Sequence, residues 1–178
     1  MTTTETTELG FDVSIAVPRR PYETDSKVQK AAAEKLAEVL IDYWKSCGEP
    51  MDREEAVYCS LEIIDNNDYD GYKLAKFCDD QWNWDVDSEL VDALNSTHSI
   101  VYKASDSAQK EWVKEYNVTV PHEVGQRVHF KLGKESKTGE IKRIWDETAK
   151  LTIRNDEGYN NSSTTGNVVP VEDVLSII

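Results

Sequence analysis

The chain has few of the residues that build catalytic, redox or metal centres. Its 178 residues include only three cysteines and three histidines. An odd number of cysteines without a C-x-x-C pair excludes a disulfide framework and a zinc knuckle and favours reduced, buried thiols. The histidines show neither H-x-x-x-H nor H-E-x-x-H spacing, and no P-loop, G-x-S-x-G or G-x-G-x-x-G motif is present. We therefore expect no cofactor, no metal and no enzymatic activity.

Long apolar runs are also missing. No stretch approaches the roughly 18 apolar residues that a membrane-spanning helix needs. Residues 1–8 are rich in Thr and Glu and contain neither the basic nor the apolar segment of a signal peptide. We expect a disordered tail over 1–8 and a cytoplasmic protein that does not associate with membranes.

Positive charge is scarce and unevenly distributed. The chain has 20 Lys and Arg against 34 Asp and Glu, a net charge of −14. Residues 1–120 hold 12 basic against 25 acidic side chains, whereas residues 121–178 hold 8 against 9. Five Trp and eight Tyr still supply enough apolar area for a core. The shift in charge predicts two domains, an acidic and mainly helical one over 9–117 and a smaller one over 118–178.

Apolar spacing predicts one strand and four to five helices in the acidic domain. Alternating apolar residues over 11–17 predict the strand, which the segment Pro18-Arg19-Arg20-Pro21 ends as a turn. Apolar residues at three- and four-residue steps predict the first helix, which Gly48 and Pro50 terminate. Asp52 and Glu55 form a capping box for the second helix, and Asp85 caps the fourth. The predicted helices cover about 26–47, 53–64, 71–80, 86–94 and 97–116, the last interrupted near Ser105-Asp106.

After Pro121 the apolar period changes to two, which predicts short antiparallel strands and a closing turn over 174–178. The segments Val124-Gly125-Gln126-Arg127-Val128, Lys137-Thr138-Gly139-Glu140-Ile141 and Val169-Pro170-Val171 resemble SH3-like small barrels of the Tudor and KOW type, over about one third of the chain. The predicted fold class is therefore α+β, with helices followed by a small antiparallel barrel.

The resemblance implies a binding domain, because such barrels bind nucleic acid, proteins or methylated side chains. The aromatic residues available for a methyl-lysine cage are Phe130, Trp145 and Tyr159. Acidic residues alternate with the basic ones, so the net charge of this domain is close to zero. We therefore do not expect direct binding of nucleic acid.

The stretch from Asp52 to Asp92 is the most unusual part of the chain. It carries thirteen Asp and Glu against Arg53, Lys73 and Lys76, with aromatic residues among the acids. Aromatic anchors surrounded by polar groups are typical of protein interfaces. The predicted partner-binding residues are Asp65, Asp68, Tyr69, Asp70, Tyr72, Asp79, Asp80, Trp82, Trp84, Asp85 and Asp87.

A calcium loop fits this stretch poorly. Asn66, Asp68, Asp70 and Gly71 fall at positions 1, 3, 5 and 6 of an EF-hand loop, but position 12 is Phe77 where a bidentate Glu is required. Acid pairs such as Asp79-Asp80 would suit acid–base catalysis only if burial raised a pKa, and exposed acids usually form a solvated face.

These features favour a non-catalytic interaction protein. Its acidic surface would dock, in the manner of a DNA mimic, on a basic site of a nucleic-acid-handling protein and act as an inhibitor or regulator. In charge and size, though not in motif, the chain is similar to small acidic proteins of phages and mobile elements that block host defence nucleases. Two alternatives remain open. One is a nucleic-acid- or chromatin-associated adaptor that works through the barrel, and the other is a metal-dependent enzyme that uses clustered carboxylates.

Overall fold

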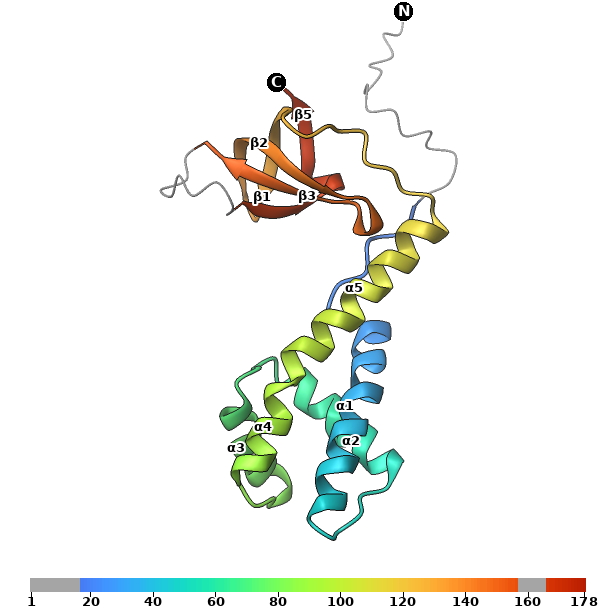
Figure 1. Ribbon diagram of the computed structural model, residues 1–178, viewed down its shortest axis with the longest axis vertical. Coiled ribbons are helices and arrows are strands. Elements are labelled where there is room, and N and C mark those ends of the chain that lie inside the picture. The colour runs from blue at the N-terminus through green and yellow to red at the C-terminus, as the bar shows by residue number, and fades with distance from the viewer. Residues whose placement is uncertain (1–16, 157–165) are drawn as a thin grey trace, which may run out of the picture.

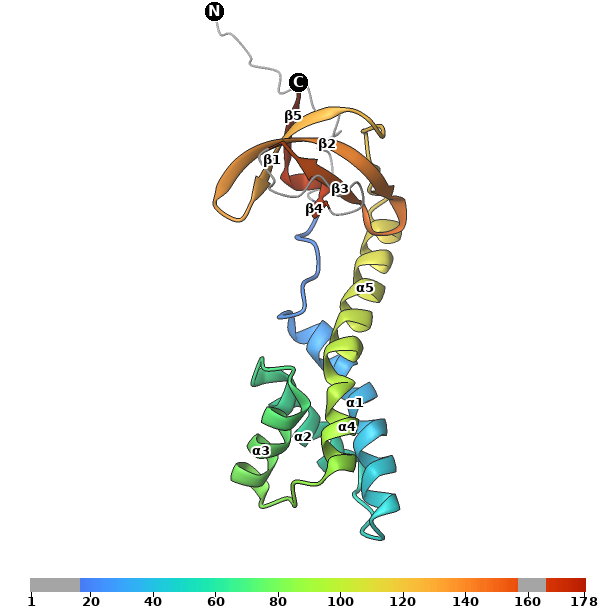
Figure 2. The same cartoon turned by 60° about the vertical axis from the view of Figure 1, so that its left-hand side comes forward.

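Five helices precede a five-stranded antiparallel sheet, which confirms the predicted α+β fold class (Figure 1). The structure is a computed structural model that describes residues 17–156 and 166–178, so the predicted tail and all but the last residue of the predicted N-terminal strand lie outside it. Helices and sheet occupy opposite ends of an elongated molecule, and α5 reaches from one to the other (Figures 1 and 2). The helices are α1 (Ser26–Ser46), α2 (Arg53–Asp65), α3 (Gly71–Trp82), α4 (Ser88–Asn95) and α5 (Thr97–Glu115).

Helix α1 begins and ends where the sequence predicts. Its buried residues recur at three- and four-residue steps, from Val28 to Tyr43. Gly48 lies just beyond the last turn with φ of +82°, the left-handed conformation that glycine adopts without a steric penalty. Asp25 is the N-cap, but its carboxylate accepts a hydrogen bond from the Tyr22 backbone N–H (2.9 Å) and not from the helix.

Aspartates start three of the other helices. The carboxylates of Asp52, Asp70 and Asp87 accept backbone N–H groups three residues further on, at 2.9, 3.0 and 2.7 Å. These bonds satisfy donors that have no partner within the helix. The prediction that Asp85 caps the fourth helix is wrong, because α4 begins at Ser88 and its N-cap is Asp87. Val86 precedes the helix and is exposed.

Helix α5 runs without the predicted interruption at Ser105-Asp106. Its buried residues are Thr97, Val101, Ser105, Gln109 and Trp112. These positions lie three or four residues apart, so a continuous helix places all of them on one face. Ser105 is therefore part of the inner face and does not break the helix.

The helices and the sheet have separate hydrophobic cores. Leucines, isoleucines and small residues of all five helices form the first core, together with Tyr43 and Trp84. Val128, Phe130 and Ile141 belong to the second core, which the inner faces of the strands enclose.

The sheet has the strand order β4-β3-β2-β1-β5. Its strands are β1 (Arg127–Leu132), β2 (Glu135–Trp145), β3 (Lys150–Asn155), β4 (Asn167–Pro170) and β5 (Val174–Ile177). The predicted closing turn at the end of the chain is wrong: β5 pairs antiparallel with β1, with Val128 opposite Ile177. Within the described residues β4 and β5 are the two edges and do not pair with each other, so the observed unit is an antiparallel sheet and the predicted barrel closure is not seen.

The segment from Pro18 to Pro21 connects the two ends of the molecule. It lies along α5, where the indole N–H of Trp112 donates to the Pro18 carbonyl and the Gln109 side-chain amide donates to the Pro21 carbonyl, both at 2.9 Å. Between these two bonds the Arg20 side chain enters the protein and is only 2% exposed. The sequence predicts only a turn here, whereas the structure shows a segment that contacts both the helices and the sheet.

Candidate functional site

The acidic stretch from Asp52 to Asp92 forms an exposed surface on α2, α3, α4 and the loops between them. Nine of its carboxylates are exposed, cap no helix and make no ion pair with any residue that the structure describes: Glu54, Glu55, Glu62, Asp65, Asp79, Asp80, Asp85, Glu89 and Asp92. We call these nine residues the acidic surface. Two of the three basic residues in the stretch are already engaged, since Arg53 binds Glu34 (2.5 Å) and Lys73 binds Asp68 (3.0 Å). The charge of the acidic surface is therefore directed at solvent.

Exposed apolar side chains lie among these acids. On α2, Glu54, Tyr58, Leu61 and Asp65 follow at steps of four, three and four residues, which places them on one face. Tyr58 is 57% exposed and Leu61 is also exposed. One face of α2 thus presents two apolar side chains between two carboxylates.

The predicted partner-binding acids divide into two groups. Asp65, Asp79, Asp80 and Asp85 are exposed and unpaired within the described chain. The other three have structural partners: Asp70 and Asp87 cap helices, and Asp68 is held by the backbone N–H of Asp70 and by Lys73, which together lower the pKa of its carboxyl group. Only the first group is free to meet a partner.

The predicted aromatic anchors are buried to different degrees. Tyr72 is 57% exposed, and Tyr69 is half-buried with its ring 5.4 Å from that of His98. Trp84 is only 8% exposed and belongs to the helical core, where its ring lies 5.2 Å from that of Trp44. The ring of the half-buried Trp82 lies 5.0 Å from that of Trp84, tilted by 39°. The prediction that Trp84 contacts a partner is therefore wrong, because hydrophobic burial places this indole inside the protein.

The acidic loops do not supply a metal site in the described part of the chain. Asp70 of the EF-hand-like match uses its carboxylate to start α3, and Phe77 packs against Trp82 at 5.7 Å. No group of three or more His, Cys, Asp or Glu side chains comes together among residues 17–156 and 166–178. The thiols of Cys59 and Cys78 are buried, and burial raises their pKa values to about 11 and about 12. Neither thiol is ionised near neutral pH.

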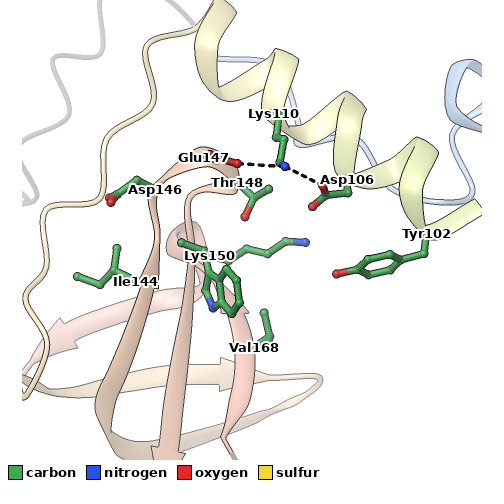
Figure 3. A pocket seen from close by; sticks show the side chains of 10 residues that line it. Tyr102, Asp106, Lys110, Ile144, Asp146, Glu147, Thr148, Lys150 and Val168 are labelled. Atoms are coloured by element: carbon green, nitrogen blue, oxygen red, sulfur yellow. Dashed lines mark ion pairs between the residues drawn. The ribbon is translucent and has the colours of Figure 1, made fainter. Parts of the chain in front are cut away.

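A cleft separates α5 from the sheet, and the sequence gives no signal for it (Figure 3). Two cavities of about 480 and 630 Å³ share Tyr102, Asp106, Lys150 and Val168 in their walls. Lys110 bridges the cleft, since its ammonium binds Asp106 of the same helix (3.2 Å) and Glu147 of the sheet (3.0 Å). We call this space the α5–sheet cleft.

The buried Arg20 lies at the second of these cavities. Its guanidinium donates to both carboxylate oxygens of Glu172 (2.6 and 2.8 Å) and to the backbone carbonyls of Thr148 and Ala149. The plane of Trp112 covers it at 4.8 Å, a distance typical of a cation–π contact. Arg20 therefore joins three elements that lie far apart in the sequence.

Several basic residues of the sheet are paired with acids of the same sheet. Arg127 binds Asp156 (2.6 Å), Arg154 binds Glu140 (3.0 Å), and Lys142 also binds Glu140. Arg143 stacks on the Trp145 indole, with its guanidinium carbon 3.6 Å from the ring centre. Within the described chain, ion pairs therefore engage four of the eight basic residues between positions 121 and 178: Arg127, Lys137, Lys142 and Arg154.

Comparisons with family models, curated proteins and solved structures find no match to this chain. Among the residues that the structure describes, no helix is long and apolar enough to cross a bilayer.

Proposed function

We propose that this protein is a non-catalytic interaction protein whose acidic surface docks on a basic, nucleic-acid-binding site of a partner protein in the cytoplasm. The observation that carries the proposal is the set of nine exposed, unpaired carboxylates on α2, α3, α4 and their loops. A surface that presents many uncompensated negative charges attracts basic surfaces and accelerates their encounter.

The apolar residues within this surface support recognition of a protein. Tyr58, Leu61 and Tyr72 of the same stretch are also exposed. Apolar and aromatic side chains supply most of the affinity at protein interfaces, whereas the charges around them supply specificity and rate. By occupying a nucleic-acid site the protein would act as an inhibitor or regulator of its partner.

The sheet supports the adaptor alternative less well. Four of its basic residues, Arg127, Lys137, Lys142 and Arg154, already bind carboxylates of the sheet. Phosphate contacts would have to replace these ion pairs, so the free energy gained on binding would be small. We therefore place the main function on the helices.

Affinity capture from the source cells tests the proposal. The full chain is compared with a variant in which Asp65, Asp79, Asp80 and Asp85 are all changed to Asn. We expect the wild type to retain nucleic-acid-binding proteins that double-stranded DNA displaces, and the variant to lose them. Raising NaCl from about 50 to about 500 mM should release the same proteins, because this salt screens exposed charges.

A matched control variant neutralises the same number of acids at positions outside the acidic stretch. Asp42, Glu49, Glu111 and Glu123 are exposed acids outside residues 52–92. Changing all four to the corresponding amides should leave the captured proteins unchanged. Loss of capture in both variants would show that net charge alone is responsible, and capture that DNA does not displace would contradict docking at a nucleic-acid site.

A further inference from the structure

The α5–sheet cleft has the composition of a small-molecule site. Its cavities of about 480 and 630 Å³ fall within the range usual for ligand pockets. Three of its wall residues, Tyr102, Trp145 and Val168, are large apolar side chains that remain exposed. They come from three different elements, so the fold and not one amphipathic helix brings them together.

Lys150 is the polar group that this cleft leaves without a partner. Its side chain is half-buried and lines both cavities (Figure 3), and it makes no ion pair or hydrogen bond within the described chain. Burial lowers the pKa of Lys150, and the nearby positive charge of Arg20 lowers it further. Two cations thus lie close together in a partly dehydrated space.

The acids around Lys150 have other partners or act from a distance. Lys110 holds both Asp106 and Glu147, and Arg20 holds Glu172. The charges of Asp106, Glu23 and Glu172 raise the pKa of Lys150 less than burial and Arg20 lower it. A half-buried ammonium without a hydrogen-bonded anion costs free energy, which an incoming anion would recover.

The apolar wall beside Lys150 is held in place. The Trp145 indole N–H donates to the Thr152 hydroxyl (3.0 Å), and Arg143 covers the ring. The ring is thus fixed on the sheet, while Tyr102 extends into the cleft from α5 (Figure 3). Because the aromatic side chains are already fixed, they lose less conformational entropy when a ligand binds.

We propose that the α5–sheet cleft binds a small molecule with one anionic head, a carboxylate or a phosphate monoester, on an apolar body of one or two rings. The head would bind the Lys150 ammonium, and the body would pack between Trp145, Tyr102 and Val168. This site does not depend on the acidic surface, because the two share no residue.

Titration of the full chain with three probes tests the proposal: 1-naphthoate, 1-naphthyl phosphate and the neutral 1-naphthalenemethanol. Binding is followed by amide and indole shifts in ¹H–¹⁵N spectra. We expect at least one anionic probe to shift the Trp145 indole and to bind about tenfold more tightly than the alcohol, as expected for one charge-assisted hydrogen bond. The anionic probe that binds more tightly identifies the preferred head group.

The variant Lys150→Met keeps the apolar stem and removes the ammonium. It should lose that tenfold preference for the anion, while the alcohol binds as before. Lys134→Met changes an exposed lysine in the β1–β2 turn and should have no effect. The proposal would be overturned if anion and alcohol bound with equal affinity, or if Lys150→Met kept the preference for the anion. Spectral shifts only outside the cleft, or no shift at the highest probe concentration, would overturn it as well. The variant with Asn at positions 65, 79, 80 and 85 should bind the same probe as tightly as the wild type. Its result therefore distinguishes a failure of this site from a failure of the proposed docking function.

Discussion

At the scale of single residues, His122 lies between α5 and the first strand and is buried without a partner for its Nδ1 atom. Burial lowers the pKa of its imidazole, and a hydrogen bond with the Gln126 side chain opposes this shift only in part. The folded protein therefore holds His122 neutral at pH values at which the unfolded chain binds a proton.

This difference predicts a pH dependence of stability. The unfolded imidazole titrates near its ordinary pKa of 6.5, so the stabilising effect of the neutral form is complete above that pH. It is lost as the pH falls from 6.5 toward the lowered pKa of the folded state, because the unfolded state then binds more protons. Denaturant unfolding at pH 7.5, 6.5 and 5.5 measures the loss, and His122→Phe should remove it.

The carboxylates provide the control for this experiment. Asp68, Glu135, Glu140 and Asp156 have pKa values held low by hydrogen bonds and nearby cations. Their contribution is lost only as the pH falls below the ordinary carboxyl range, so it lies outside the window of His122. An equal loss of stability between pH 7.5 and 5.5 in His122→Phe would contradict the assignment.

Burial also decides which aromatic residues can act at the acidic surface. The sequence places Tyr72 and Trp84 in the same acidic stretch, and nothing in their local pattern separates them. The structure leaves Tyr72 exposed and puts Trp84 in the core beside Trp44. Their difference depends on α1, which is distant in sequence, so composition alone could not predict it.

At the scale of elements, α3 and α4 approach each other very closely at Gly71. This glycine opens α3, its backbone N–H donates to the Asn95 side-chain oxygen (3.2 Å), and it is buried. A Cβ atom at this position would lie 2.4 Å from Asn95 Oδ1 and 2.5 Å from the Val91 carbonyl oxygen. Close contact with the backbone of α4 thus explains why residue 71 has no side chain.

Gly71→Ala should therefore destabilise the protein. We expect a loss of about 1–3 kcal/mol in the free energy of unfolding, the usual cost of an overpacked contact. Denaturant titration followed by tryptophan fluorescence measures it. Lys76→Ala, at an exposed position of the same helix, should change stability by less than about 0.5 kcal/mol.

A second variant separates the two contacts. Asn95→Ala combined with Gly71→Ala removes the side-chain clash but keeps the clash with the Val91 carbonyl, so it should restore only part of the lost stability. A Gly71→Ala variant as stable as the wild type would show that α3 and α4 can move apart at no cost.

Local sequence patterns predicted most elements correctly and failed where distant residues decide. Asp52 and Glu55 identify the start of α2, and Gly48 identifies the end of α1, because caps depend on neighbours in the chain. Asp85 and Asp87 are both good N-cap residues, so the local pattern does not separate them, and α4 begins after Asp87. The terminal strand β5 forms by pairing with β1, and the cleft around Lys150 forms between the sheet and α5. Both depend on residues distant in sequence, so a local pattern cannot predict them.

At the scale of the whole molecule, one side chain makes most of the polar contacts that hold the helices to the sheet among residues 17–156 and 166–178. Arg20 binds Glu172 and two backbone carbonyls of the sheet, and it packs on Trp112 of α5. The surface ion pair of Lys110 with Glu147 adds little, because exposed salt bridges contribute about 0–1 kcal/mol. We therefore expect the junction to depend on Arg20.

Arg20→Met should loosen this junction and leave both hydrophobic cores intact. The substitution removes the Arg20 donor from the Thr148 carbonyl and from the Glu172 carboxylate, while the Ala149 carbonyl keeps the Val171 backbone N–H (3.0 Å). We therefore expect a loss of about 2–4 kcal/mol in the free energy of unfolding. Faster hydrogen exchange in residues 146–150 and at the Trp112 indole would locate the change. Arg19→Met, at the exposed neighbouring position, is the matched control and should alter neither measurement.

Two outcomes would contradict this account of Arg20. Unchanged exchange in residues 146–150 would mean that the α5 contacts with the sheet suffice. Unfolding of the helical core alone, with the sheet intact, would mean that Arg20 stabilises α1 and α5 and not the junction.

The pairing of Arg20 with Glu172 also constrains the order of events during synthesis. The two residues are 152 positions apart, so Arg20 leaves the ribosome long before its partner has been made. All five helices can fold during that interval around their own core, while a charged side chain destined for burial stays in water. The junction can be completed only after Glu172 has been translated, so a product stalled before that residue would carry an acidic surface without a completed junction.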